Sequence, residues 1–253
     1  MHLKQLRGDN MPWVWPYGQV SSVLDVAARL LKNGHLAPFD SVVAKSQTQG
    51  RGQMRRTWFS PSGNVYAALR LPYEVPFCED SAAPALGALL SQAFKLLGLE
   101  VKLKWPNDLV FELGGWPHKF GGILLEERRG TILAGIGLNY RFKPDPTYLR
   151  SEAQLPVTSM LDFAPKMVNA SRAEDFWAKL VNMVISTYKD GEEFKDRWRD
   201  WFQEAMVFKG RQVEVGDLCQ GKLLGLGSKG GLLLSYEGEV QEVLTGSLRL
   251  KIS

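Results

Sequence analysis

The stretch Val101–Asn139, VKLKWPNDLVFELGGWPHKFGGILLEERRGTILAGIGLN, determines the fold. Short apolar runs alternate in it with turn-forming residues, namely a Trp-Pro-Asn-Asp turn, two consecutive glycines and an Arg-Gly pair. Runs of this length between such turns are typical of β-strands joined as antiparallel hairpins. The stretch therefore predicts four neighbouring strands, at Val101–Lys104, Leu109–Leu113, Gly121–Glu127 and Thr131–Asn139.

Helices and further strands are predicted on both sides of this stretch. Residues Ser21–Gly34 place apolar side chains at helical spacing, with Ser21 or Ser22 as the capping residue. An Ala/Leu-rich helix is expected at Ala82–Leu97. The remaining elements are strands at Ser41–Lys45 and Asn64–Leu71 and a mostly helical stretch at Arg172–Trp201 that is interrupted near Gly191. Together these elements predict the α/β class, a mixed sheet flanked by helices.

The composition changes after Met206. Residues Gly210–Ser253 are rich in glycine and in short apolar runs separated by turn residues. This spacing predicts a small all-β barrel. We therefore expect two domains, residues 1–206 and residues 207–253, with Met1–Pro12 as a loose tail.

The overall composition is that of a globular protein. The chain has 253 residues, of which 45% are hydrophobic, and a formal net charge of +4; a balance of this kind excludes general disorder. Cys78 and Cys219 are too few for a disulfide framework or a cysteine metal site. The N-terminal residues lack the apolar core of a secretory signal, and no apolar run is long enough to span a bilayer. We therefore expect a cytoplasmic protein that does not bind a membrane.

Four groups of residues are candidates for chemistry. Gln47–Gly63 combines glycines, which allow close backbone approach, with arginines, whose planar forks suit phosphate or carboxylate. Lys104–Asp108 places a lysine and an amide at a strand end, and Lys119 enters an apolar strand just before two glycines. The fourth group, Gly135–Asn139, puts glycines inside a strand. Each group also has an ordinary structural interpretation: a solvated loop, a surface turn over a buried Trp105, a lysine reaching out to solvent, and a β-bulge.

In their order along the chain these motifs resemble the biotin protein ligase family. The motifs are G-R-G-x-x-x-R-x-W-x-S-P-x-G, K-W-P-N-D, K-x-x-G-I-L-x-E and G-I-G-x-N, and the resemblance spans Val20–Arg249. It implies an α/β catalytic fold shared with lipoate ligases, followed by a small C-terminal SH3-like β-barrel. It also implies that biotin reacts with MgATP to give biotinyl-adenylate and pyrophosphate, and that biotin then passes to a lysine of a biotin carboxyl carrier protein. ATP, Mg²⁺ with the ATP, and biotin are the ligands implied.

The resemblance also assigns roles to individual residues. Lys119 matches the lysine that bridges the biotin carboxylate and the phosphate, and it is the main catalytic residue implied, together with Arg51. The biotin site implied by the resemblance consists of Ser22, Gln47, Gly50, Arg51, Lys119 and Gly122. The ATP or adenylate site implied consists of Arg56, Trp58, Asn107, Asn139 and Arg249. No metal-ligand residue is implied.

Two segments depart from the family's pattern. The first helix starts with Ser22, Val23 and Leu24, where the family usually has Ser-Thr-Asn. The loop has Gln53 in place of an arginine and Arg55 in place of a glycine. A glutamine lacks the charge that strengthens a hydrogen bond to phosphate. We therefore expect biotinyl-adenylate to be held less tightly than in relatives with the full arginine set.

Three further expectations concern alternatives and partners. Only about twenty residues precede the region of resemblance, which implies a monofunctional ligase that does not bind DNA. The alternative functions are a lipoate or octanoate protein ligase on the same fold, and a degenerate, non-catalytic relative that binds a nucleotide or a nucleic acid. The motifs K-W-P-N-D and G-I-L-x-E favour biotin, and the retained Arg51, Lys119 and Asn139 favour catalysis. A sheet edge near Leu124–Arg128 offers a place where two subunits can pair as a homodimer.

Overall fold

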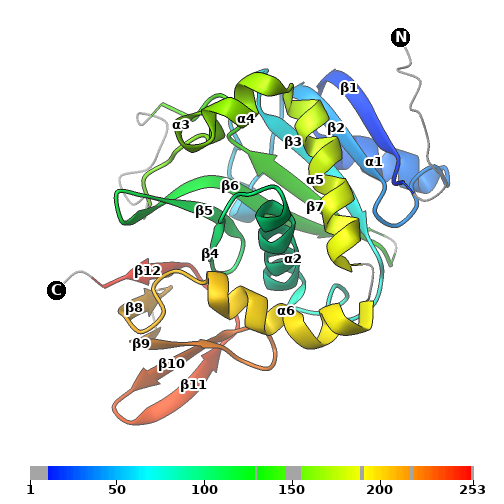
Figure 1. Ribbon diagram of the computed structural model, residues 1–253. Coiled ribbons are helices and arrows are strands. Elements are labelled where there is room, and N and C mark those ends of the chain that lie inside the picture. Colours follow the sequence, from blue (N-terminus) through cyan, green and yellow to red (C-terminus); the bar gives the residue numbers. More distant parts are fainter. Residues whose placement is uncertain (1–10, 129, 146–154, 189–190, 217–218, 252–253) are drawn as a thin grey trace.

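The computed structural model describes residues 11–128, 130–145, 155–188, 191–216 and 219–251 and contains two sheets (Figure 1). The strands of the larger sheet are β1 (Val14–Val20), β2 (Ser41–Gln47), β3 (Val65–Leu71), β4 (Lys102–Lys104), β5 (Asp108–Leu113), β6 (Trp116–Glu127) and β7 (Ile132–Leu138). Those of the smaller sheet are β8 (Gln212–Val215), β9 (Cys219–Leu226), β10 (Leu232–Tyr236), β11 (Glu239–Val243) and β12 (Leu248–Leu250). The helices are α1 (Val23–Lys32), α2 (Ala82–Leu96), α3 (Met160–Phe163), α4 (Pro165–Ala170), α5 (Ala173–Tyr188) and α6 (Gly191–Ala205), with a short 3₁₀ turn at Gln53–Arg55.

The larger sheet has the order β1-β2-β3-β7-β6-β5-β4. Only β1 and β2 run parallel, and all other neighbours are antiparallel, so the predicted mixed sheet with hairpins in its second half is confirmed. Strand β6 begins at Trp116 rather than at the predicted Gly121. The reason is a tight turn at Gly114 and Gly115, both with positive φ, which brings β6 back along the whole of β5. Lys119 therefore lies inside a strand.

Strand β1 was not predicted, and part of the expected tail lies outside the described residues. Pro16 and Gly18 stand inside β1, and both residue types weaken strand patterns in a sequence. The strand is nevertheless formed at the sheet edge, where its backbone pairs with β2 from Val14 to Val20. Of the expected tail Met1–Pro12, residues 1–10 are not among those that the structure describes.

Both faces of the larger sheet are buried over much of β2, β3 and β7, which explains why these strands are almost continuously apolar. On one face, helix α1 packs with Val42 and Ala44 of β2 and with Ala68 of β3. On the other face, α2, α5 and α6 pack against alternate residues such as Val43 and Ala67 (Figure 1). Alternation of side chains along a strand sends neighbouring residues to opposite faces, so each face has its own core.

The C-terminal region forms a five-stranded antiparallel sheet of order β11-β10-β9-β8-β12, a small β domain as expected. Apolar residues of this sheet belong to the same core cluster as the larger sheet, among them Val213, Leu223 and Leu248. The buried indole of Trp105 also donates a hydrogen bond from Nε1 to the carbonyl oxygen of Gly230, at 2.9 Å. Because the core is shared, the division after residue 206 stays a prediction.

One segment of β6 has a strand partner on one side only, within the described part of the chain. Strand β7 pairs with β6 from Gly121 to Glu127, whereas β5 pairs with it only as far as Gly122. The edge expected near Leu124–Arg128 therefore exists on the β5 side, from Leu124 to Glu127. Whether two subunits pair along this edge stays a prediction.

We predict that Trp105→Phe lowers the free energy of unfolding by about 2 kcal/mol, because it leaves the buried Gly230 carbonyl without its donor. Urea denaturation measures this change. The matched control is Trp116→Phe, since Trp116 is 41% exposed and the change should stay within about 0.5 kcal/mol. Equal effects of the two substitutions would show that the hydrogen bond to Gly230 does not hold the two sheets together.

Candidate active site

The centre of the site is a flat surface made by two glycines. Gly122 on β6 lies directly opposite Gly137 on β7, and the indole of Trp58 lies over both. A Cβ atom at Gly137 would come within 2.5 Å of Trp58 Cε2, and one at Gly122 within 3.4 Å of Trp58 Cζ3. No larger residue fits at Gly137 while Trp58 stays there. This pair of glycines, which we call the glycine floor, therefore accommodates a flat ring.

Beside the glycine floor, one carboxylate joins two lysines. Asp108 on β5 lies 2.5 Å from Lys119 Nζ on β6 and 3.4 Å from Lys104 Nζ on β4. The exposed fractions of the side chains are 6% for Lys104, 15% for Asp108 and 29% for Lys119. Lys119 Nζ also lies 5.6 Å from the centre of the Trp58 ring. The more accessible lysine, Lys119, thus lies beside the floor, and the more buried lysine, Lys104, lies on the other side of Asp108.

The three charged groups influence one another's pKa values. Burial alone would raise the pKa of Asp108, but the charges of Lys119 and Lys104 outweigh it and hold this pKa below its ordinary value. Burial lowers the pKa of Lys104; Asp108 opposes this effect, while the positive charges of Lys119 and Arg249 add to it. Arg249, on β12, therefore brings the charge of the smaller sheet to this cluster. With one acid among three bases, the region favours an anionic ligand.

The backbone of Lys119 is fixed by the segment that follows the proline-rich loop. The amide N–H of Lys119 donates to the carbonyl of Pro156 at 2.8 Å, and that of Thr158 donates to the carbonyl of Lys119 at 2.9 Å. Asn139 Nδ2 in turn donates to the Thr158 carbonyl at 3.1 Å, so Asn139 holds this segment in place. Asp162 binds the Thr158 hydroxyl at 2.9 Å and closes a capping box at the start of α3.

The side chain of Gln47, instead of a serine, binds a free amide at the start of α1. Ser22 is the N-cap residue of α1, as predicted, but its side chain makes no capping hydrogen bond. Gln47 Oε1 instead accepts a hydrogen bond from the Val23 amide at 2.9 Å, and Gln47 Nε2 donates to Ser60 Oγ at 3.0 Å. The side chain of Gln47 therefore ties β2 to the start of α1 and to the end of the glycine-rich loop.

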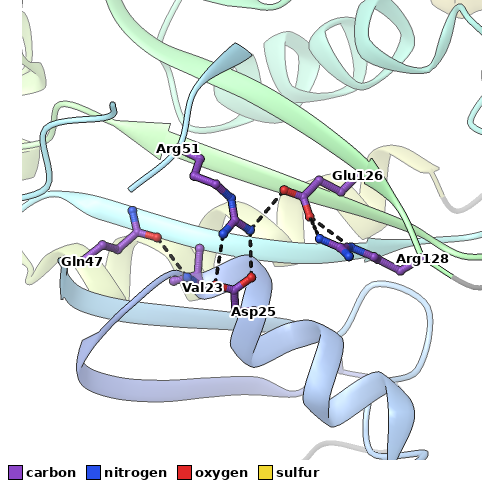
Figure 2. Close-up of polar contacts among 6 residues, drawn as sticks. All are labelled: Val23, Asp25, Gln47, Arg51, Glu126 and Arg128. Carbon is purple, nitrogen blue, oxygen red and sulfur yellow. Dashed lines mark hydrogen bonds and ion pairs between the residues drawn. The ribbon is translucent and has the colours of Figure 1, made fainter. Parts of the chain in front are cut away.

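Arg51 is surrounded by carboxylates (Figure 2). Its guanidinium donates two hydrogen bonds to Asp25 on α1, at 2.9 and 3.1 Å, and one to Glu126 on β6, at 3.1 Å. The hydrogen bonds that Arg51 donates to Asp25 contribute most to raising the pKa of Arg51 above its ordinary value. Glu126 is bound in addition by Arg128, at 2.7 and 3.2 Å. Arg51 thus connects the loop to a helix and to a strand.

The structure places the predicted site residues in different surroundings. Trp58, Lys119 and Gly122 meet at the glycine floor. Gly50 and Arg51 lie in the loop that leads to Trp58, Gln47 contacts the end of that loop at Ser60, and Ser22 precedes Val23, whose amide binds Gln47. Asn107 and Asn139 lie nearby, but their side-chain amides donate to main-chain carbonyls, of Ile123 and Thr158 respectively. Arg56 is exposed, and its guanidinium lies 3.7 Å from Met54 Sδ.

Five residues of the site were given no individual role from the sequence. They are Asp25, Lys104, Asp108, Glu126 and Gly137. Lys104, Asp108 and Gly137 lie in groups that were candidates for chemistry, and Glu126 lies in a recognised motif, so only Asp25 stands outside both. Asp25 carries no such signal, because an acidic residue in the first turn of a helix is common on surfaces.

No group of three or more His, Cys, Asp or Glu residues in the described part of the chain could hold a metal ion. No helix among the described residues has the length and apolar character needed to cross a membrane.

We predict that Asp108→Asn lowers the free energy of unfolding by about 3 kcal/mol at pH 7, because it leaves two lysines without their buried counter-charge. The pKa of Asp108 is depressed in the folded protein, so its contribution is present above the unfolded value of about 4 and is lost as the pH falls below it. The difference between wild type and variant should therefore shrink below pH ~4. Denaturant unfolding at several pH values measures this difference.

Glu100→Gln, which breaks an exposed pair with Lys102, is the control and should show no such pH dependence. A pH-independent difference for Asp108→Asn would contradict the account.

Known proteins resemble the chain in sequence and in fold. A model of the biotin/lipoate A/B protein ligase family matches residues 31–142. The bifunctional ligase/repressor BirA of Bacillus subtilis (strain 168) is 24% identical over 258 residues, which cover 92% of this chain and 73% of that protein. The biotin–[acetyl-CoA-carboxylase] ligase of Paracoccus denitrificans is 33% identical over 129 residues, 46% of this chain and 51% of that protein.

The similarity of the structures extends over both sheets. A biotin protein ligase from Aquifex aeolicus, solved in complex with biotin and ATP, superposes with a TM-score of 0.74 at 25% identity. The superposition covers 95% of this chain and 99% of that one. The family model lies over β2 to β7, the strands that carry the glycine floor and the lysine cluster. The chain is therefore similar in sequence to the biotin/lipoate A/B protein ligase family over residues 31–142, and it shares the fold of a biotin protein ligase over nearly its whole length.

Proposed function

We propose that the chain is an ATP-dependent biotin protein ligase. The observation that carries this proposal is the position of Lys119, whose charged amine lies between the glycine floor and the buried Asp108. A biotin ring bound beside Trp58 and the glycine floor would direct its carboxylate chain towards this amine. The names of the relatives from Paracoccus denitrificans and Aquifex aeolicus, both biotin ligases, support biotin as the substrate.

The proposed first step joins biotin to the nucleotide. A biotin carboxylate oxygen attacks the α-phosphorus of ATP, the bond between the α-phosphorus and its bridging oxygen to the β-phosphorus breaks, and pyrophosphate leaves. Negative charge grows on the oxygens around phosphorus, and a fixed positive charge there lowers the barrier. Lys119 is the nearest such charge to the floor, while Lys104 and Arg249 add to the positive field behind it. Mg²⁺ enters with the phosphates of ATP.

The proposed second step transfers biotin to a carrier. The amine of a carrier lysine attacks the acyl carbon of the adenylate, an amide bond forms, AMP leaves, and the amine loses a proton. The chain needs no nucleophilic side chain for either step, since positioning and charge suffice. The glycine floor and its covering loop would keep water from the mixed anhydride until the carrier arrives.

The proposed partner is the biotin carboxyl carrier protein of a carboxylase, the substrate class named for the Paracoccus denitrificans relative. The free thiols of Cys78 and Cys219 support action in the cytoplasm, where thiols stay reduced.

The alternative of a lipoate or octanoate ligase is tested by substrate choice. We predict that the protein exchanges labelled pyrophosphate into ATP only when biotin is present, because the relatives from Paracoccus denitrificans and Aquifex aeolicus are both named as biotin ligases. Equal stimulation by lipoate or octanoate would overturn the biotin assignment. No exchange with any of the three acids would favour a non-catalytic relative.

We predict that Lys119→Ala loses biotin-dependent exchange by about two to three orders of magnitude, the usual effect of removing one donor at a developing oxyanion. The matched control is Lys102→Ala on strand β4, because the Lys102 amine pairs with the exposed Glu100 instead of Asp108. Thermal denaturation of both variants shows whether they are folded. Activity of Lys119→Ala within a few fold of Lys102→Ala would remove Lys119 from the mechanism.

A further inference from the structure

We propose that Arg51 is a positioning residue. Its ion pairs with Asp25 and Glu126 hold the loop of residues 50–58, which carries Trp58, over the glycine floor. We call Arg51, Asp25 and Glu126 the loop clasp. In this role the Arg51 guanidinium contacts neither biotin nor the adenylate. The inference rests on the proposed function of the site, and it assigns to Asp25 and Glu126 a part in that function.

The geometry of the loop clasp is that of a fixed anchor (Figure 2). Both terminal nitrogens of Arg51 bind the two oxygens of Asp25, at 3.1 and 2.9 Å, which is the bidentate arrangement that best fixes a guanidinium. One of the same nitrogens also donates to Glu126 Oε1 at 3.1 Å. The side chains are 33%, 37% and 20% exposed for Arg51, Asp25 and Glu126, so water screens these pairs only in part.

The clasp acts on the loop because Arg51 stands at the base of a small hairpin. Arg51 forms an antiparallel bridge with Thr57, and the Gly52 amide donates to the Arg56 carbonyl at 2.7 Å. The amide of Trp58, the next residue, donates to the Gly50 carbonyl at 2.9 Å. An anchor at Arg51 therefore also fixes the returning limb of the hairpin. Trp58, which covers the glycine floor, belongs to that limb.

Gly50 makes the base of the hairpin narrow. A Cβ atom at Gly50 would come within 2.4 Å of the Trp58 carbonyl oxygen and 2.5 Å of Ser60 Oγ. Since Ser60 Oγ donates to that same carbonyl at 2.8 Å and accepts from Gln47, the two limbs are joined tightly at this point. The tip is different, since Met54 is 82% exposed and has a positive φ. The hairpin is thus anchored at its base and open at its tip.

Charge also disfavours Arg51 as a direct ligand of phosphate. Its guanidinium lies between two carboxylates, and to reach a phosphate it would have to leave both. The two carboxylates would then lie uncompensated close to the added negative charge, with only Arg128 still bound to Glu126. Lys119, Lys104 and Arg249 supply positive charge beside the floor without such a rearrangement.

The test is a set of variants that separates anchoring from direct contact. The two acids are neutralised without change of shape, as Asp25→Asn and Glu126→Gln, singly and together. Arg51→Gln is made in the wild-type protein and in the protein that already carries both acid substitutions. For each variant, biotin-dependent pyrophosphate exchange gives KM for biotin and kcat, and thermal denaturation verifies the fold.

If Arg51 acts through the clasp, neutralising both acids and replacing Arg51 should have the same effect. We expect KM for biotin to rise about 5- to 30-fold, the factor that corresponds to one or two lost contacts, with little change in kcat. Arg51→Gln should add nothing in the protein that lacks both acids. A further large loss of kcat in that background would show that the guanidinium touches the reacting groups, and unchanged kinetics after loss of both acids would show that the clasp has no role. Either result overturns the inference.

A second measurement does not depend on catalysis. Limited digestion with trypsin reports the mobility of the loop, because Arg55 and Arg56 are cleavage sites within it. The ligand-free protein with both acid substitutions should be cut there faster than wild type, and Arg172→Gln, which breaks an exposed pair with Asp175 on α5, should be cut at the wild-type rate. No acceleration in the acid variants overturns the clasp. If the wild type shows no exchange while the loop is cut faster, the clasp holds and the proposed function fails.

Discussion

The site depends on one buried carboxylate that compensates two lysines. Asp108, Lys104 and Lys119 come from three adjacent strands of the larger sheet, β5, β4 and β6. A lysine that is only 6% exposed is stable in the protein only with a counter-charge, and Asp108 provides it. The same carboxylate also pairs with the more exposed lysine, Lys119, and holds its amine beside the glycine floor. A shift of register by one residue would send these side chains to opposite faces, so the pairing of the strands and the chemistry of the site constrain each other.

The smaller sheet adds to this arrangement in two ways. Its buried apolar residues continue the main core, and the hydrogen bond from Trp105 to Gly230 joins it to the turn that precedes Asp108. It also brings the charge of Arg249 near enough to lower the pKa of Lys104. The sheet is therefore both a structural support and a source of positive charge for the nucleotide side of the proposed site.

Much of this could be predicted from the sequence, and the rest depends on contacts between distant residues. The strands between Val101 and Asn139 follow from short apolar runs and glycine turns, and the motifs located Lys119 and Gly122 beside the site. Strand β1 was missed because Pro16 and Gly18 obscure its pattern, and only pairing with β2 makes it a strand.

The roles of Gln47 and Arg51 were not predictable in the same way. Gln47 caps a helix that begins 24 positions earlier, and Arg51 binds partners 26 and 75 positions away. No local pattern encodes such pairs, since each residue type alone is equally suited to ligand binding or to structure. For the same reason Asp25 appeared to be an ordinary surface acid, although in the folded chain it is part of the loop clasp.

The central claim is that this site activates biotin for transfer to a protein. It is tested most directly by incubating the protein with labelled biotin, ATP and Mg²⁺ and a purified biotin carboxyl carrier domain, followed by mass spectrometry of the carrier. The account predicts that one carrier lysine acquires biotin in an ATP-dependent reaction, and that a carrier with this lysine replaced by arginine stays unmodified. An unmodified carrier in the complete reaction, or labelling that does not require ATP, would contradict it.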